Sequence, residues 1–489
     1  MSLTKIAIEI LEAAKAIDRE LDIKPRTSQQ YTTNPTPLFK FSRKSCRIRQ
    51  AFKSFFGKSE RSSHGNSALH KGKHIDTPSR SSGESEEIPE LSLFERYSQL
   101  PENQTPTRDK LLDKCHQIKT LIETPEAALI NIYTNWTELV SLETICHFRI
   151  FEAIPPTGSA TYSEIAAYAR IPRDFAVRFI RINILNGIFS EPFPGHVYHT
   201  PRSRWLLTRG PGLLDLIELN CRELAPAGLL YPEVIEKYGA AQEPNESPFA
   251  LANDNLPFFE VLSRDEKRRL RFGRGMQYLT SAECYDVRHI LEGYDWAAVD
   301  TPGARVLDVG GGLGHISALI AASTKELHFT VQDLPPVIAD AVANKFDLAE
   351  PSLLDRISFL PLSFFTPHPS SSPAFDVVFL RWIIHNWSDK YTCQIFRAMI
   401  PALRKGSQVL IIEYLLDDQC FGVNMSHAFS LRIDMMMGVG FGSKERSARG
   451  IRELMNEVAH EFGGSWSNWS VTRPKSSLIS FISAVWDGV

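Results

Sequence analysis

The sequence predicts a doubly wound α/β domain in its C-terminal part, preceded by an all-helical and winged-helix domain. After Gly303, strand-like and helix-like segments alternate regularly. The strand-like segments are runs of Val, Ile and Leu without polar alternation, which is typical of parallel strands buried on both faces. The first run leads through a glycine-rich loop into a helix, as expected where a ligand binds beyond the carboxyl end of a strand.

Length and composition narrow the class of protein. The 489 residues predict two or three domains, and a net charge of −3 with 43% hydrophobic residues argues against a globally basic nucleic-acid binder or a wholly disordered chain. Seven scattered cysteines form no C-x-x-C pair, so neither a disulfide framework nor a structural zinc site is predicted. Because no segment reaches the roughly 18 apolar residues of a membrane span, we expect a soluble cytoplasmic protein without stable membrane insertion.

The first 90 residues divide into two segments of different character. In residues 1–36, apolar residues recur at steps of three and four, which predicts an N-terminal amphipathic helix. Residues 37–90 are basic and Ser-rich, which predicts a disordered insert. Its front end alternates basic and aromatic residues, so a membrane-surface or calmodulin-type helix remains the alternative.

Residues 91–225 are predicted to form a helical and winged-helix domain. A short helix starts at Ser163 and is broken by Pro172, a second helix is capped by Asp174 and runs to Leu185, and residues 187–200 alternate as strand, turn and strand. A DNA-reading role for this unit is the alternative, because three arginines lie on or beside the second helix: Arg173, Arg178 and Arg181. Neighbouring acidic residues and the lack of a local basic excess argue against it.

Residues 226–300 read as connecting helices that contribute to a substrate pocket, and residues 301–489 form the α/β domain. Its candidate parallel strands are RVLDVG (305–310), LHFTVQD (327–333), RISFLPL (356–362), FDVVFLR (375–381) and QVLIIEY (408–414).

The glycine loop indicates which ligand binds. A dinucleotide fingerprint counted from Gly310 would require glycine at position 315, where the chain has His315, and no triphosphate-binding loop is present. The loop reads D-x-G-x-G-x-G instead, with Gly310 and Gly312 able to approach a ligand closely. Asp333 ends the next strand, where a carboxylate can accept hydrogen bonds from both ribose hydroxyls of a nucleoside.

Four motifs in order, VLDVGGGLGHIS, VQDLPPVI, FDVVFLRWIIHNWSD and SKER, resemble the plant caffeic-acid-type and fungal aromatic O-methyltransferases, which are class I enzymes dependent on S-adenosyl-L-methionine (SAM). The resemblance covers about residues 110–489. It implies a Rossmann-like methyltransferase domain with a mostly parallel seven-stranded sheet, and a winged-helix domain that makes a homodimer instead of binding nucleic acid.

The resemblance also assigns roles residue by residue. His385 falls on the catalytic base, and Glu413 and Glu445 fall on the two carboxylates beside it. Cofactor contacts are implied for Gly310, Gly312, Asp333, Ser363, Phe364, Arg381 and Trp387. Substrate contacts are implied for Phe272, Met276, Trp382 and the methionine run around Met436. The family requires no metal, and we identify no metal-ligand cluster in the sequence.

Two positions depart from the family pattern. Ser363 stands where an acid usually binds the adenine amine, which would weaken SAM binding by roughly 1–2 kcal/mol. Asn386 follows His385 where an aspartate is usual, a change of smaller expected effect because that side chain should face away from the substrate. The loss at Ser363 and the basic insert motivate an alternative function, a non-catalytic dimeric binding or regulatory protein.

The residues suit methyl transfer to a phenol. A phenol has a pKa near 10 and is a poor nucleophile until a base removes its proton, and a neutral imidazole held by a carboxylate can do so. We therefore expect a SAM-dependent O-methyltransferase acting on a phenolic small molecule, such as a polyketide secondary metabolite.

Overall fold

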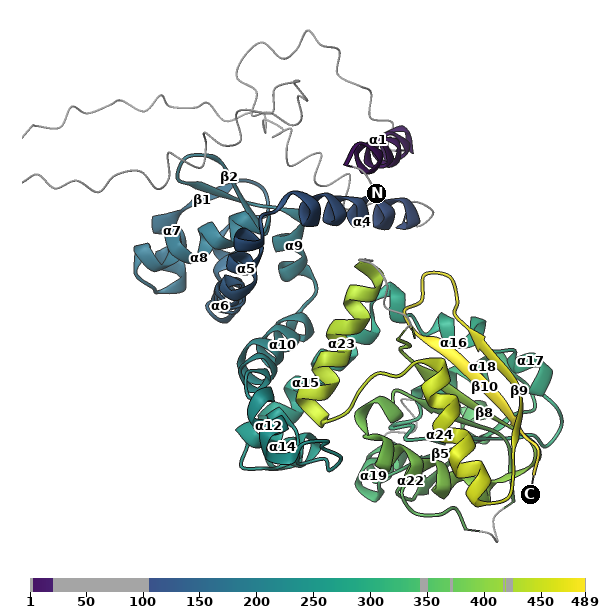
Figure 1. Ribbon diagram of the computed structural model, residues 1–489. Helices are drawn as coiled ribbons and strands as arrows, with labels where there is room; N and C mark the ends of the chain where they lie inside the picture. The colour runs from purple at the N-terminus through teal and green to yellow at the C-terminus, as the bar shows by residue number, and fades with distance from the viewer. Residues whose placement is uncertain are drawn as a thin grey trace, which may run out of the picture. The chain divides into compact units, whose positions relative to one another are not determined.

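The computed structural model describes residues 3–20, 105–343, 351–369, 373–416, 418 and 425–488 (Figure 1). Its contacts divide the chain into two units, Met1–Ala13 with Pro101–Val489, and Ala14–Leu100. The predicted basic insert, residues 37–90, lies outside the described residues. Helix α1 (Leu3–Glu20) lies in the segment predicted to be amphipathic, and Glu9 forms an ion pair of 2.7 Å with Lys114.

Helices dominate the chain from residue 105 to the start of the large sheet. They are α4 (Thr105–Ile122), α5 (Pro125–Thr134), α6 (Trp136–His147), η3 (Ile150–Ala153), α7 (Tyr162–Ala169), α8 (Arg173–Leu185), α9 (Pro201–Thr208), α10 (Pro211–Leu219), η4 (Asn220–Leu224), α11 (Ala225–Gly228), α12 (Tyr231–Tyr238), α13 (Pro248–Ala252), α14 (Phe258–Arg264), α15 (Glu266–Thr280), η5 (Glu283–Tyr285), α16 (Arg288–Glu292) and α17 (Trp296–Val299).

A small antiparallel sheet accompanies α7 and α8. Its strands β1 (Ser159–Thr161), β2 (Phe189–Phe193) and β3 (His196–His199) pair in the order β1-β3-β2, so the helix, helix, strand and strand predicted for residues 163–200 are all present. Helix α7 begins at a capping box in which Thr161 and Glu164 exchange hydrogen bonds. The predicted cap of α8 is wrong, because Pro172 occupies the cap position and Asp174 lies in the first turn, where its charge still favours the helix dipole.

The C-terminal domain contains a seven-stranded sheet in the order β6-β5-β4-β7-β8-β10-β9. The first five strands of that order are parallel, while β10 pairs antiparallel with both β8 and β9. The mostly parallel sheet is therefore confirmed. The strands are β4 (Arg305–Val309), β5 (His328–Asp333), β6 (Ile357–Pro361), β7 (Phe375–Arg381), β8 (Leu403–Glu413), β9 (Trp466–Thr472) and β10 (Ser480–Trp486).

Helices cover both faces of this sheet. They are α18 (His315–Ser323), α19 (Pro335–Ala343), α21 (Pro351–Leu354), α22 (Asp389–Met399), η7 (Ile400–Ala402) and α24 (Ala448–Glu461), with the short turn η6 (Ile384–Asn386) after β7 and the long helix α23 (Met425–Phe441) after β8. None of the helices in the described residues has the length and apolar character needed to cross a membrane.

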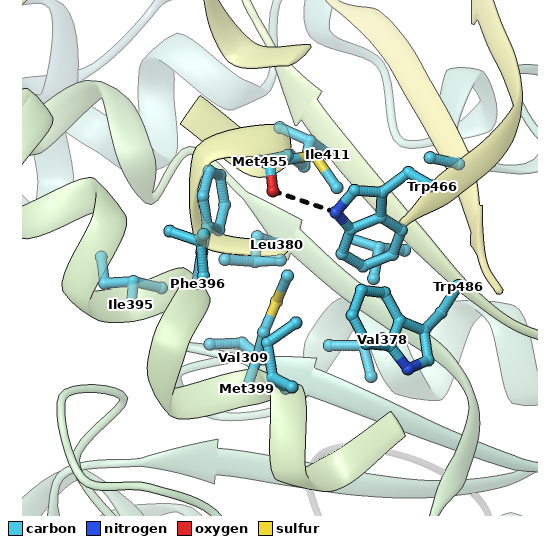
Figure 2. Packing of buried hydrophobic residues seen from close by; sticks show 14 of the residues in the cluster. Val309, Val378, Leu380, Ile395, Phe396, Met399, Ile411, Met455, Trp466 and Trp486 are labelled. Carbon is cyan, nitrogen blue, oxygen red and sulfur yellow. Dashed lines mark hydrogen bonds between the residues drawn. The ribbon is translucent and has the colours of Figure 1, made fainter. Parts of the chain in front are cut away.

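Alternate residues of one strand enter two different cores, as the two-residue period of a strand requires. In β7, Val378 and Leu380 pack with α22 and α24, while Val377 and Phe379 pack with α17 and α18 on the other face. Figure 2 shows the first core, in which Trp466 Nε1 donates a hydrogen bond of 3.0 Å to the carbonyl of Met455. The two-sided burial fixes the carboxyl ends of the parallel strands, where the predicted site residues lie.

Candidate active site

The glycine loop follows the end of β4, and its backbone has a conformation that only glycine adopts easily. Gly310 has φ 72° and Gly312 has φ 59°. A Cβ on Gly310 would lie 2.5 Å from Cδ1 of Ile383, whereas a Cβ on Gly312 would meet no atom within 4 Å. The loop is thus packed against the turn after β7 on one side and has free space at Gly312, which suits a ligand lying against its backbone.

Asp333 lies beside this loop at the end of β5. Its Oδ2 accepts a hydrogen bond of 2.9 Å from the Gly312 N–H, and its Oδ1 accepts one of 2.7 Å from the Leu334 N–H. Burial raises the pKa of Asp333, although the two backbone bonds oppose the rise. Each carboxylate oxygen keeps lone-pair capacity, so the group can still bind two ribose hydroxyls.

The segment after β6 borders the same edge. Leu362 N–H donates to the carbonyl of Asp333 at 3.0 Å, which places Ser363 next to the end of β5. Ser363 Oγ accepts from the Phe365 N–H at 3.3 Å. Phe364 packs edge-to-face against Trp387 with ring centroids 5.9 Å apart, so these two predicted cofactor residues form one aromatic wall.

Arg381 ends β7, and Trp382 follows it in an unusual geometry. Trp382 has φ 54°, a left-handed conformation that costs a bulky residue roughly 1–3 kcal/mol and is often found at functional sites. The Arg381 guanidinium carbon lies 4.1 Å from the centre of the Trp382 ring. Arg381 Nε is buried and has no hydrogen-bond partner among the described residues, and burial lowers the pKa of this guanidinium against the attraction of Asp308 and Glu413.

His385 lies in η6, three residues after Trp382. The structure brings all three predicted catalytic residues together. His385 Nδ1 is 2.9 Å from Glu445 Oε1 and 3.6 Å from Glu413 Oε2. Both carboxylate side chains are buried, and the His385 side chain is 12% exposed. No hydrogen-bond partner of His385 Nε2 is found in the described part of the chain.

Glu413 connects the sheet to the turn that carries the histidine. It is the last residue of β8, and its Oε1 accepts hydrogen bonds from the N–H groups of Ile383 (2.9 Å) and Ile384 (3.0 Å). Its Oε2 faces His385 and has no hydrogen-bond partner among the described residues. One carboxylate therefore both shapes the turn and places charge beside the imidazole.

The electrostatics of the three residues are coupled. Burial lowers the pKa of His385, but the charges of Glu413 and Glu445 outweigh burial, so the pKa lies above 6.5. Burial raises the pKa of Glu413, and repulsion from Glu445 adds to this rise. The imidazolium form of His385 is thus stabilised by two carboxylates at one ring nitrogen.

The same three residues form a group that sequence reasoning did not identify as potential metal ligands. Their ligand atoms all lie within 4.8 Å of one another, a spacing that a metal ion also accepts. The 2.9 Å distance from His385 Nδ1 to Glu445 Oε1 is that of a charge-assisted hydrogen bond, which places a proton between the two atoms.

The predicted substrate residues lie on three elements. Phe272 in α15 packs edge-to-face against Phe258 at 5.3 Å, and Met276 on the same helix is half-buried. Trp382 stacks on Tyr414 with ring centroids 6.1 Å apart and an interplanar angle of 4°. Met436 in α23 is half-buried, and α23 contacts η6, the turn that carries His385.

Sequence reasoning missed the residues that hold the predicted catalytic groups in place. Asp434 Oδ1 accepts the backbone N–H of Glu445 at 2.8 Å, and Ser443 and Arg446 bind backbone carbonyls of the His385 turn. The SKER motif contained the signal for Ser443 and Arg446, because polar residues that flank a predicted catalytic carboxylate need partners of their own when buried.

These features define the class of protein. A sheet with one antiparallel strand next to its edge, a glycine loop after β4 and a carboxylate at the end of β5 are the framework of a class I SAM-dependent methyltransferase. The site suits SAM, because the glycine loop offers free space at Gly312, Asp333 offers acceptors, and the buried Arg381 Nε is a donor without a partner among the described residues.

Comparison with known proteins gives the family. A family profile described as O-methyltransferase domain matches residues 239–461. The chain is 32% identical to the O-methyltransferase VdtC of Byssochlamys spectabilis over 361 residues, which cover 73% of this chain and 82% of that protein. It is 28% identical to the chlorophenol O-methyltransferase of Trichoderma longibrachiatum over 404 residues, 82% of this chain and 85% of the relative.

Solved structures agree on the fold. LepI in complex with SAM has a TM-score of 0.64 at 18% identity, over 81% of this chain and 97% of that one. The chain belongs to the O-methyltransferase family, and its cofactor is SAM.

Proposed function

We propose that this enzyme methylates a phenolic hydroxyl of an aromatic small molecule, a secondary metabolite such as a polyketide, with His385 as the general base. The observation that carries the proposal is the geometry of His385: Nδ1 is bound to Glu445 at 2.9 Å, and Nε2 has no partner in the described residues. A relative named for chlorophenol methylation supports the phenolic class.

The chain's own residues carry out the proton transfer. Glu445 accepts a hydrogen bond from Nδ1–H, which fixes the tautomer in which Nε2 has a lone pair. His385 Nε2 then takes the phenol proton, and the resulting imidazolium is stabilised by Glu445 and Glu413. When bound, SAM supplies an electrophilic methyl group on its sulfonium.

The rest of the site binds and orients. We propose that Gly310, Gly312 and Asp333 hold the nucleoside and ribose, and that Ser363 lies at the adenine. Phe364 and Trp387 provide its aromatic wall. Arg381 provides a donor from its Nε, which has no partner in the part of the chain that the structure describes. Phe272, Met276, Trp382 and Met436 are proposed to line the phenol pocket.

The test measures transfer of a labelled methyl group from SAM to a panel of phenols. We expect His385→Ala and His385→Gln to lose roughly 100-fold or more in turnover, the scale of general-base catalysis. His460→Gln is the matched control, because His460 is an exposed histidine at the end of α24. Undiminished turnover in both His385 variants would remove this residue from the mechanism.

We further propose that residues 91–225 are a winged-helix dimerisation domain and that the enzyme is a homodimer. Helix α5 buries none of its residues, although it is largely apolar. Ile132 is 71% exposed and Trp136 at the start of α6 is 62% exposed. Exposed apolar side chains gathered on neighbouring helices in this way usually mark an interface.

Sedimentation tests the dimer. The double variant Ile132→Asp with Trp136→Asp should be monomeric, while Leu229→Asp, at a residue 80% exposed outside this domain, should keep the wild-type mass. A stable and active wild-type monomer at assay concentration contradicts the proposal. We also propose a cytoplasmic location, which the lack of a disulfide among the described cysteines supports.

A further inference from the structure

The loop from Ser443 to Arg446 forms several hydrogen bonds to the turn that carries His385. Ser443 Oγ donates to the carbonyl of His385 and, at 3.2 Å, to that of Trp387. Glu445 binds the imidazole itself. Arg446, the next residue, has no role in the proton transfer described above, yet it is only 6% exposed.

The guanidinium of Arg446 reaches both sides of His385. Its Nη1 donates to the carbonyl of Ile384 at 2.8 Å, and its Nη2 donates to the carbonyl of Trp387 at 2.7 Å. Its Nε donates to Asp389 at the start of α22, at 2.9 Å. The planar fork therefore holds the residue before His385, the turn after it, and the first residue of the following helix.

The backbone of Arg446 is anchored as well. The Leu416 N–H donates to the Arg446 carbonyl at 3.1 Å, and Leu415 forms a parallel bridge with Arg446. Because Leu415 follows Glu413 by two residues, Arg446 lies where the segment after β8, the SKER loop and the His385 turn meet. Its main chain fixes Glu445 relative to Glu413, and its side chain fixes His385 relative to both.

We propose that Arg446 is a positioning residue of the proton-transfer group, which keeps His385 Nδ1 on Glu445 and directs Nε2 toward the substrate. This inference rests on the proposed role of His385 as the base. Arg446 contacts none of the reacting atoms and positions His385 through the carbonyls of Ile384 and Trp387. A lysine cannot replace it, because a single ammonium group lacks the rigid fork that spans two fixed carbonyls and a carboxylate.

The charge of Arg446 provides a second, separable effect. The carboxylates of Glu413 and Glu445 raise the pKa of His385, while the positive charge of Arg446 lowers it. The other titratable groups around these residues are Tyr414 stacked on the imidazole, Asp434 at the Glu445 backbone, Asp389 on Arg446, and Arg381 near Glu413. Removing the charge of Arg446 should therefore raise the pKa of His385. Replacing the guanidinium by an ammonium group, which keeps the charge, should not.

The experiment compares Arg446→Lys and Arg446→Met with wild type in the full-length enzyme. For Arg446→Lys we expect kcat to fall roughly 10- to 100-fold, the cost of misplacing a catalytic group by about an ångström, with KM for SAM and the acid limb of the pH profile unchanged. For Arg446→Met we expect a similar loss of kcat and an acid limb displaced to higher pH.

Lys444→Met is the matched control. Lys444 binds the same Asp389 at 2.7 Å, but its side chain is 53% exposed and it contacts neither carbonyl of the turn. We expect wild-type kcat and an unshifted pH profile. Wild-type kcat in Arg446→Lys, or an equal loss in Lys444→Met, overturns the proposal.

A measurement without substrate separates this proposal from the proposed function. The NMR titration of the His385 ring, assigned among the 14 histidines by its disappearance in His385→Gln, should shift to higher pH in Arg446→Met and stay in place in Arg446→Lys. If wild type methylates no phenol, the proposed function fails while this titration still decides the role of Arg446. An unchanged His385 titration in Arg446→Met overturns the proposal for Arg446.

If Arg446→Met does not fold, Asp389→Asn tests the charge effect of Arg446 alone, because it leaves the two carbonyl bonds intact. The unbalanced charge of Arg446 should then lower the pKa of His385, and kcat above that pKa should stay at the wild-type value because His385 keeps its position. An unchanged His385 titration in Asp389→Asn overturns the charge effect, and a loss of kcat as large as in Arg446→Lys overturns the positioning role of the two carbonyl bonds.

Discussion

The hydrogen bond from His385 to Glu445 makes Glu445→Gln the sharpest test of the proton transfer. The 2.9 Å bond joins a buried carboxylate to the imidazole, and Glu445 keeps its place through the Asp434 contact to its backbone N–H, which the substitution does not touch. The change therefore removes one negative charge without removing the side chain that fills the site.

Its magnitude follows from the kind of bond that is lost. A hydrogen bond to a charged group contributes about 1.5–3 kcal/mol, and the imidazolium that forms during reaction benefits from all of it. At about 1.4 kcal/mol per factor of ten, kcat should fall roughly 10- to 150-fold. KM for SAM should stay within about twofold, because an interaction made mainly in the transition state is lost.

The pH profile gives an independent readout. Glu445 raises the pKa of His385, so its neutralisation lowers that pKa and moves the acid limb of kcat to lower pH. The assay is initial rate against pH at saturating SAM and phenol, with the exposed Glu453→Gln in α24 as control. Full activity in Glu445→Gln, or an acid limb displaced to higher pH, would refute the reasoning.

Three further predictions concern neighbouring groups. Burial raises the pKa of Glu413 in the folded state, so ionising this carboxyl group costs stability as pH rises through that pKa. Calorimetry should therefore show that Glu413→Gln melts at a higher temperature than wild type at pH 8 and loses this advantage below about pH 4. Rate measurements should show slower turnover in the same variant. Ser363→Asp should tighten SAM binding by about 1 kcal/mol in titration calorimetry with kcat nearly constant, and weaker binding would show that Ser363 does not lie at the adenine. Dialysis against a chelator should leave turnover unchanged, and recovery of lost activity by added Zn²⁺ would instead assign His385, Glu413 and Glu445 as metal ligands.

The sequence predicted the fold where hydrophobicity alone determines structure. The unbroken apolar runs in β7 and β8 follow directly from burial on both faces, and their predicted residues agree with the structure to within a few positions. Strand β9 was not predicted from its residues, because it lies at the sheet edge and five of its seven residues are Trp, Ser or Asn, of which Trp466 alone is buried. It entered the prediction only through the family resemblance.

For the site, the sequence identified the groups but not their arrangement. His385, Glu413 and Glu445 were found by motif, and the structure brings them together. Which carboxylate lies nearer Nδ1 follows from the conformation of the turn after β7, and that turn is bound by tertiary hydrogen bonds that no local pattern encodes. The SKER motif indicates that Arg446 needs partners but not which ones, since these are main-chain carbonyls of a distant segment.

Glu413 both binds the backbone of the His385 turn and lies beside the imidazole, and this affects how such enzymes diversify. Its carboxylate is held at the end of a strand that is buried on both faces, and the same group dictates the backbone of the His385 turn. The proposed base is thereby positioned from the sheet, whereas Phe272 and Met436, which are proposed to line the phenol pocket, belong to helices α15 and α23, outside the sheet. On this proposal, mutations can reshape these helices for a new acceptor while the base keeps its position, so substrate range and chemistry are free to evolve separately.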